Sequence, residues 1–289
     1  MPTVLVTGAG GQLGWELQRC DRPELRLAAL ARKDLDVTRP AEVRRVLDQV
    51  RPRVVINAAA YTAVDRAESE PQAAFLINRD AAALLAEECR RRDIRLLHVS
   101  TDFVFDGTRG RPYKPDDPAN PLGVYGRSKR AGEEAVLELH PHGGAIVRTA
   151  WLYSAHGANF VKTMLRLFSQ REEVAVVCDQ VGTPTWAHHL ARFLLHLAAR
   201  EDAPPPILHF TDAGVASWYD LAVAVEEETR GARGRRVRVR PILSSAYPTP
   251  AKRPGYSVLD KEETWRLWPA DPVHWREALR RMLASFPFM

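Results

Sequence analysis

The chain has few cysteines: Cys20, Cys89 and Cys178 are the three among 289 residues. Their number is odd, they are scattered, and no two of them have the C-x-x-C spacing of many metal or redox sites. This pattern argues against a disulfide framework and a cysteine-based metal site. It is typical of reduced thiols in a protein of the cytoplasm.

The chain also lacks long apolar runs and a strong excess of one charge. No run reaches the roughly 18 residues that would suggest a membrane span, and no basic segment followed by an apolar core precedes residues 3–7, so we expect no signal peptide. The net charge of +5 is small for this length. The most basic stretch, residues 230–240, alternates Arg with Val towards its end and has no interleaved aromatics, which favours a solvated strand edge over a nucleic-acid site. We therefore expect neither a nucleic-acid nor a membrane partner.

A glycine-rich segment follows the first apolar run. Residues 3–7 predict a strand, Gly8, Gly11 and Gly14 follow it, and a helical pattern begins after them. Glycines at these places let the backbone turn tightly and approach a pyrophosphate at a helix N-terminus. The alternative is a glycine-rich loop without a ligand. The position directly after a first strand favours dinucleotide binding, with Gln12 and Leu13 at the same turn.

The second predicted strand, residues 25–30, leads to a mixed-charge turn. Arg32 and Lys33 favour a cofactor with a 2′-phosphate, NADPH, because a basic side chain tolerates that group. Asp34 and Asp36 follow closely, so NADH is also plausible. Asp36 and Val37 are expected to border the adenine, and the alternative is a solvated turn.

Two later strands end in residues suited to a ligand site. Residues 53–60 predict a buried strand that ends in small side chains at Ala60, before Tyr61 and Thr62. Residues 95–100 predict another strand, and Thr101 follows at its carboxyl edge. Small and hydroxyl-bearing residues at the carboxyl ends of parallel strands leave room for a cofactor and can bind it.

Alternation of strands and helices predicts an α/β fold: a doubly wound, Rossmann-like parallel sheet with helices on both faces. The regular pattern loosens after residue 153 and returns to the sheet near residue 207. We therefore predict a dinucleotide-binding domain from residues 1–152 plus 183–212. A smaller α/β domain would comprise residues 153–182 plus 213–289.

Tyr125 and Lys129 lie one turn apart on a predicted helix that runs to about residue 139. A phenol with a pKa of about 10 is a poor catalyst near neutral pH. A neighbouring ammonium would lower that pKa by stabilising the phenolate. By itself such a pair is usually a surface contact. Thr101 and the glycine loop make it a predicted proton-delivery site beside a hydride donor.

Several blocks resemble the dTDP-4-dehydrorhamnose reductases, members of the extended short-chain dehydrogenase/reductase superfamily. The resemblance covers almost the whole chain, and its blocks are residues 11–17, 57–65, 100–107, 125–129, 148–151, 159–166, 179–185 and 253–255. It implies an oxidoreductase that reduces the C4 ketone of a dTDP-4-keto-6-deoxy sugar with NAD(P)H in dTDP-rhamnose biosynthesis. The smaller domain would then bind the nucleotide sugar.

The resemblance also implies residue roles. Tyr125 would donate a proton to the C4 oxygen, Thr101 would orient that oxygen, and Lys129 would lower the Tyr125 pKa and bind the nicotinamide ribose. Asp102, Trp151 and Arg253 would contact the substrate. The cofactor-binding set comprises Gly8, Gly11, Gln12, Leu13, Gly14, Arg32, Asp36, Val37, Ala60, Tyr61, Thr62, Tyr125 and Lys129.

Some features depart from the family pattern. Magnesium held by glutamates at a dimer interface is described for the family, and Glu16 matches one such position, but residues 187–190 lack the second acid. We therefore predict no metal ligand, regard Mg²⁺ as doubtful, and keep a homodimer as one alternative. Two other functions also remain open: an NAD-retaining epimerase or dehydratase, and a non-catalytic subunit of the methionine adenosyltransferase regulatory type.

Overall fold

The computed structural model describes residues 1–285. Its centre is a parallel sheet, which within these residues has six strands in the order β10-β5-β4-β3-β1-β2. The strands are β1 (Thr3–Thr7), β2 (Arg26–Leu30), β3 (Val54–Asn57), β4 (Arg95–Thr101), β5 (Gly144–Thr149) and β10 (Ile207–His209). The predicted doubly wound parallel sheet is confirmed.

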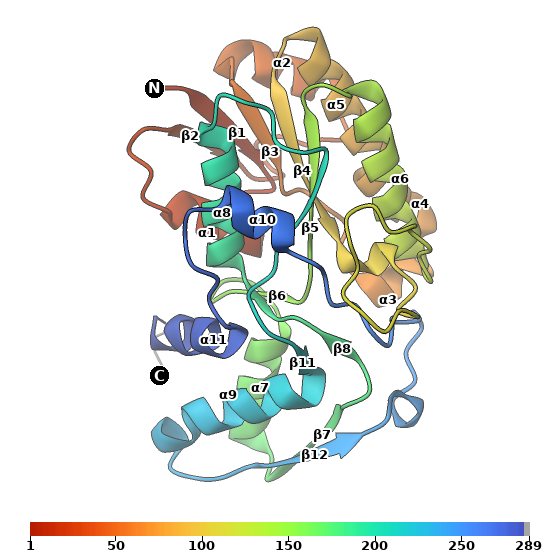
Figure 1. The fold of residues 1–289 in the computed structure, drawn as a ribbon, viewed down its shortest axis with the longest axis vertical. Helices are drawn as coiled ribbons and strands as arrows, with labels where there is room; N and C mark the ends of the chain where they lie inside the picture. Colours follow the sequence, from red (N-terminus) through yellow and green to blue (C-terminus); the bar gives the residue numbers. More distant parts are fainter. Residues whose placement is uncertain (286–289) are drawn as a thin grey trace.

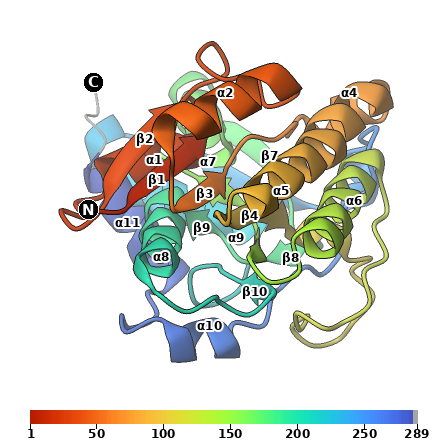
Figure 2. The same cartoon turned by 90° about the horizontal axis from the view of Figure 1, so that it is seen from above.

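Helices cover both faces of this sheet (Figure 2). One face packs on α1 (Gln12–Arg19) and α8 (Ala187–Ala199), and the other packs on α2 (Pro40–Val50), α5 (Ala81–Arg91) and α6 (Val124–Leu139). The division follows strand periodicity: in β1, Val4 and Val6 point to the first face and Leu5 to the second. Because neighbouring side chains alternate across a strand, a continuous apolar run fills both cores.

The strand order reverses beside β1. After β2 the chain crosses to the other side of β1 and continues outward through β3, β4 and β5. The carboxyl ends of β1 and β3 are therefore neighbours at a topological switch point, where open α/β sheets bind ligands. The third strand is shorter than predicted, because it ends at Asn57 and residues 58–60 run beyond the ladder.

A second group of elements lies below the carboxyl edge of the sheet in Figure 1. It comprises α7 (Phe160–Gln170), β7 (Glu173–Val177), β8 (Val181–Gly182), β11 (Ala216–Ser217), α9 (Trp218–Arg233), β12 (Arg238–Ile242) and α11 (Trp275–Ala284). All of these elements except β8 contribute side chains to a separate apolar core. The two short strands β6 (Leu152–Tyr153) and β9 (Thr185–Trp186) pair where the chain passes between the two groups. The exact domain boundaries stay a prediction, and residues 286–289 of the predicted second domain lie outside the described part.

The helical region before β4 is nearly continuous. Helix α4 (Pro71–Phe75) passes through a π-helical turn, Leu76–Asp80, into α5. Asn78 in this turn is buried, and its side chain hydrogen-bonds the backbone of Tyr61 and the hydroxyl of Ser128. The π turn thus connects the segment after β3 to α6, in keeping with the frequent use of such turns at functional sites.

Candidate active site

The glycine turn after β1 is shaped by close backbone contacts. Gly8 has φ +70°, and a Cβ there would lie 2.7 Å from the Ala58 carbonyl carbon and the Ala59 nitrogen. A Cβ on Gly14 would lie 2.4 Å from the Gly8 oxygen. Side chains at either position would push α1 or the segment after β3 away, so both glycines are needed for this turn. Helix α1 begins directly after it, and its free N–H groups face the switch point.

A cleft of about 200 Å³ opens beside this turn. It is lined by Gly8, Gly11, Arg32, Leu35, Asp36, Val37, Thr38, Ala58, Ala59, Ala60 and Ile77. Six residues predicted from the sequence therefore lie around one cavity: Gly8, Gly11, Arg32, Asp36, Val37 and Ala60. The glycine cradle and the acidic and basic side chains at its far end fit a dinucleotide.

Other predicted cofactor residues have different places. Leu13 is buried in the sheet core, so its backbone alone could meet a ligand. The Gln12 amide oxygen accepts a 2.9 Å hydrogen bond from Asn159. The Tyr61 hydroxyl donates to Glu70 at 2.6 Å, which raises the pKa of Tyr61, and Thr62 is exposed. Binding roles for these residues stay predictions.

The end of the cleft near β2 carries one acidic and one basic side chain, Asp36 and Arg32. Asp36 accepts hydrogen bonds from the Thr38 amide at 3.0 Å and hydroxyl at 2.7 Å, and these bonds lower its pKa. Arg32 is exposed and also favours the Asp36 carboxylate. An anionic phosphate would meet Arg32, and a ribose hydroxyl would meet Asp36.

Helix α6 packs closely on the 3₁₀ turn η2 (Asp102–Val104), which follows β4. A Cβ on Gly126 would lie 2.2 Å from the Phe103 oxygen, so glycine permits this approach. The approach brings Tyr125 edge-on to Phe103, with ring centroids 5.5 Å apart, and close enough to Thr101 for that side chain to favour the phenolate. The structure therefore brings together Thr101 and Tyr125, which are distant in the sequence.

Lys129 is almost fully buried. Its Nζ donates to the Val99 carbonyl at 2.7 Å and lies 3.2 Å from Nε2 of His98. Burial lowers the pKa of Lys129 to about 8, because the ammonium loses its hydration. Burial also raises the pKa of Tyr125 to about 12, opposed by the hydrogen bond to Thr101. Burial is therefore the largest effect on the Tyr125 pKa, and its lowering by Lys129 stays a prediction.

The low pKa of Lys129 makes stability pH-dependent. Between pH 8 and 10.5 the unfolded chain holds a proton on this lysine that the folded chain has released, so stability due to this group rises with pH. Relative to Lys129→Met, we expect the wild-type unfolding free energy to increase by roughly 3 kcal/mol over that range. Urea unfolding at several pH values measures the difference, and two parallel curves would contradict it.

The predicted substrate residues are spread over three environments. Asp102 is buried, one carboxylate oxygen accepts from Thr101 at 3.1 Å, and the other has no partner among residues 1–285. Burial raises its pKa to about 6. Trp151 has φ +46° and stacks on Trp218 at 3.6 Å with an interplanar angle of 4°. Their contacts with substrate stay predictions.

Arg253 is already engaged within the chain. Its guanidinium binds the two oxygens of Asp65 at 3.0 and 2.8 Å, and it donates to Thr249 at 2.6 Å. Because Asp65 follows β3 and Arg253 follows β12, this pair joins the two groups of elements. A substrate contact would have to share or replace the bond to Asp65.

The possible metal residues make contacts within the chain. Glu16 is buried, accepts from the Ser154 hydroxyl at 2.6 Å and lies 3.5 Å from Nδ1 of His188. Searched over residues 1–285, the structure has no group of three or more His, Cys, Asp or Glu side chains placed to hold a metal. The same part of the chain has no helix long and apolar enough to span a membrane.

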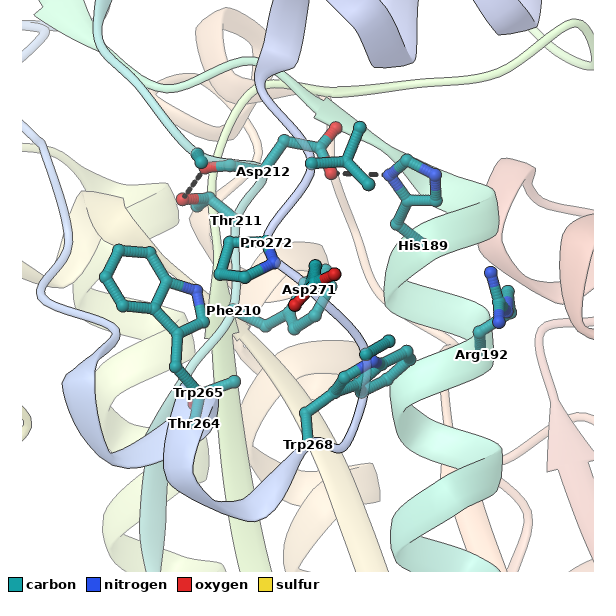
Figure 3. A pocket seen from close by; sticks show the side chains of 13 residues that line it. His189, Arg192, Phe210, Thr211, Asp212, Thr264, Trp265, Trp268, Asp271 and Pro272 are labelled. Atoms are coloured by element: carbon teal, nitrogen blue, oxygen red, sulfur yellow. Dashed lines mark hydrogen bonds and ion pairs between the residues drawn. The ribbon is translucent and has the colours of Figure 1, made fainter.

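A second cavity, of about 50 Å³, lies between α8 and α10 (Glu262–Leu267). Figure 3 shows His189 of α8 pointing to Asp212, with Nδ1 and the carboxylate oxygen 2.6 Å apart. Trp265 and Trp268 line the opposite side. This cavity contains none of the residues predicted for the site.

Sequence reasoning missed the polar residues behind the site. Asn57, Asn78 and Ser128 are buried and hydrogen-bonded, and they hold the backbone around the cleft and α6. His98 is also buried and hydrogen-bonded to Asn57, and it contacts Lys129. A buried polar residue at the end of an apolar strand was the available signal.

A glycine cradle at the switch point, with a Tyr–Lys pair and a threonine nearby, defines the class of Rossmann-fold reductases. Residues 2–287 match the family described as RmlD substrate binding domain. The dTDP-4-dehydrorhamnose reductase of Streptomyces griseus is 48% identical over 99% of this chain and 93% of its own. The dTDP-4-keto-6-deoxy-D-glucose reductase of Streptomyces niveus is 44% identical over 99% and 96%. A solved dTDP-4-dehydrorhamnose reductase from Bacillus anthracis in complex with NADP is 36% identical, with a TM-score of 0.92 over 99% and 100% of the two chains. The chain belongs to this RmlD family.

Proposed function

We propose that this protein reduces the C4 ketone of dTDP-4-dehydro-L-rhamnose to dTDP-L-rhamnose with NADPH. The observation that carries the proposal is that Tyr125 lies beside Thr101 where α6 packs on η2, with Lys129 one turn along the same helix and bound to the Val99 carbonyl. The π turn connects this cluster to the cofactor cleft, because Ile77 lines the cleft and Asn78 binds Ser128 of α6. The names of the relatives supply the substrate class.

The cofactor would lie with its pyrophosphate at Gly8 and Gly11, where a Cβ would fill the cradle, and its adenosine end at Arg32 and Asp36. When bound, it supplies the hydride. Tyr125 donates a proton to the C4 oxygen as that oxygen gains charge, and Thr101 orients the same oxygen. Lys129 returns a proton towards Tyr125. The hydroxyl of Thr101 currently bonds Asp102, so substrate binding must redirect it.

The test is to supply dTDP-4-dehydro-L-rhamnose with NADPH and identify the product sugar. Formation of dTDP-L-rhamnose is expected, and failure to consume the ketone at micromolar enzyme would refute the proposal. A parallel reaction with dTDP-4-keto-6-deoxy-D-glucose distinguishes the two substrates for which relatives are named. Firmly retained NAD in the purified protein would favour an epimerase or dehydratase instead, and binding to a methionine adenosyltransferase without turnover would favour the regulatory type.

We expect a modest preference for NADPH over NADH, carried by Arg32. Arg32→Ala should lower kcat/KM for NADPH about tenfold, because a charge-assisted hydrogen bond is worth about 1.5–3 kcal/mol. The value for NADH should change little, since the carboxylate of Asp36 remains. Steady-state kinetics with both cofactors measure the effect. Lys33→Ala is the matched control, because Lys33 does not line the cleft. An equal fall with both cofactors would show that Arg32 does not bind the 2′-phosphate.

A further inference from the structure

A buried row of hydrogen bonds lies behind Lys129. It begins at Thr7 of β1 and passes through Asn57 of β3 and His98 of β4 to Nζ of Lys129 on α6. The successive distances are 2.6, 3.0 and 3.2 Å. Each of the four residues is at most 2% exposed. Buried polar groups in such a row must match donor to acceptor at every step.

The direction of the row is set by the backbone of Ala59. Its N–H lies 3.2 Å from Oδ1 of Asn57, and a backbone N–H can only donate. The Asn57 atom facing Ala59 and Thr7 is therefore the oxygen, and the amide nitrogen faces His98. That nitrogen donates to Nδ1 of His98, so Nδ1 is an acceptor. The proton of the neutral imidazole must then be on Nε2.

This tautomer faces Lys129 with a donor. Nε2–H points to Nζ at 3.2 Å, and an ammonium group has no lone pair to accept it. A neutral amine accepts from Nε2–H and still donates to the Val99 carbonyl at 2.7 Å. We propose that His98 is a positioning residue whose Nε2–H, fixed by Asn57, disfavours the ammonium form of Lys129.

The other charged groups around Lys129 oppose this effect weakly. Glu133, one turn along α6, favours the ammonium, but Arg148 of β5 binds its carboxylate through two bonds of 2.8 Å and Arg130 lies 3.1 Å from it. Tyr125, on the other side, stays a neutral phenol in this site. Burial lowers the pKa of Lys129 to about 8 and the pKa of His98 well below its usual range. These directions agree with a neutral imidazole whose Nε2–H disfavours the ammonium form of Lys129.

The consequence for catalysis rests on the proposed reductase function. After each proton donation Tyr125 must be reprotonated, and Lys129 must release and regain a proton to do this. Proton transfer is most effective when the pKa of the group is near the working pH. By disfavouring the ammonium, His98 brings Lys129 into that range. His98 itself touches Lys129 and is separated from the substrate side by it.

The first test reads the tautomer directly and needs no turnover, so it can fail independently of the proposed function. Long-range ¹H–¹⁵N spectra of the cofactor-free protein at pH 7 should show His98 as a neutral imidazole with the proton on Nε2. The His98→Gln variant, lacking the signal, assigns it. A proton on Nδ1, or an imidazolium, would overturn the proposal.

The second test reverses the donor and acceptor roles in the part of the row that involves His98. In Asn57→Asp the carboxylate still accepts from Thr7 and Ala59 and also accepts a hydrogen bond from the His98 ring, so the imidazole proton moves to Nδ1 and Nε2 becomes an acceptor. In the pH profile of kcat, the pH at which activity falls on the alkaline side should rise by about one unit or more, because the ammonium is now favoured. Thr7→Val is the matched control: Ala59 still orients Asn57, so this pH should stay in place. An unshifted pH in Asn57→Asp would overturn the proposal.

A double variant distinguishes the effect of the new carboxylate's charge from the effect of the His98 tautomer. In Asn57→Asp/His98→Gln no imidazole connects the new carboxylate to Lys129, so the shift should disappear relative to His98→Gln. A shift of the same size would mean that the carboxylate acts through its charge and that the tautomer of His98 is not the cause. The dissociation constant for NADPH, measured by fluorescence in each variant, should stay within a few-fold.

Discussion

Turnover should fall about a thousand-fold, within a range of roughly 10²–10⁴, when Tyr125 is replaced by phenylalanine, because general acid catalysis contributes about that factor. The phenyl ring can keep the edge-on contact with Phe103, so the packing of α6 on η2 is retained. The proton donor alone is removed. NADPH binding should therefore be nearly unchanged. Single-turnover oxidation of NADPH and a fluorescence titration measure the two quantities.

The matched control is Tyr113→Phe. Tyr113 is buried, and its hydroxyl donates to Asp106 at 2.8 Å in the loop that precedes α6. This variant loses a hydroxyl of the same kind outside the site, and its turnover should remain near the wild-type value. Turnover of Tyr125→Phe within tenfold of wild type would refute the proton-donor role.

Breaking the buried Arg148–Glu133 pair should have the largest effect on stability. Both side chains are at most 1% exposed, and two bonds of 2.8 Å join them. Arg148→Met leaves the Glu133 carboxylate buried without its main partner, which should cost about 3–5 kcal/mol. Arg148 also donates to the Pro115 carbonyl at 3.1 Å, so the loop before α6 should loosen as well. Urea denaturation monitored by tryptophan fluorescence measures the loss.

Two further variants show whether the loss of stability comes from leaving a charge buried without a partner or simply from losing an ion pair. Arg148→Met/Glu133→Leu removes both charges and should recover much of the stability, since a buried pair is often replaceable by apolar side chains. Arg266→Met removes one partner of an exposed pair with Glu262 and should leave the unfolding free energy almost unchanged, because water screens an exposed pair. A double variant as unstable as Arg148→Met would show that the buried charge is not the cause.

Much of the cofactor site could be predicted because the rules that place it are local. A strand followed by glycines and a helix predicts the cradle, and parallel strands bring their carboxyl ends to one edge. For this reason Gly8, Arg32 and Ala60, which follow three different strands, line one cleft. Likewise, helical spacing places Tyr125 and Lys129 one turn apart on α6.

The tertiary structure decided what surrounds these residues. The direction in which the Tyr125 pKa shifts depends on burial by η2 and on Asp102. The bond between Arg253 and Asp65 joins residues 188 positions apart in the sequence. The row from Thr7 through Asn57 and His98 depends on β1, β3 and β4 being neighbours, an order that the linear chain does not display. Periodicity within a segment determined the elements and the faces they bury. The protonation of Lys129 followed from contacts among four elements, because desolvation and hydrogen-bond direction exist only once those elements are packed together.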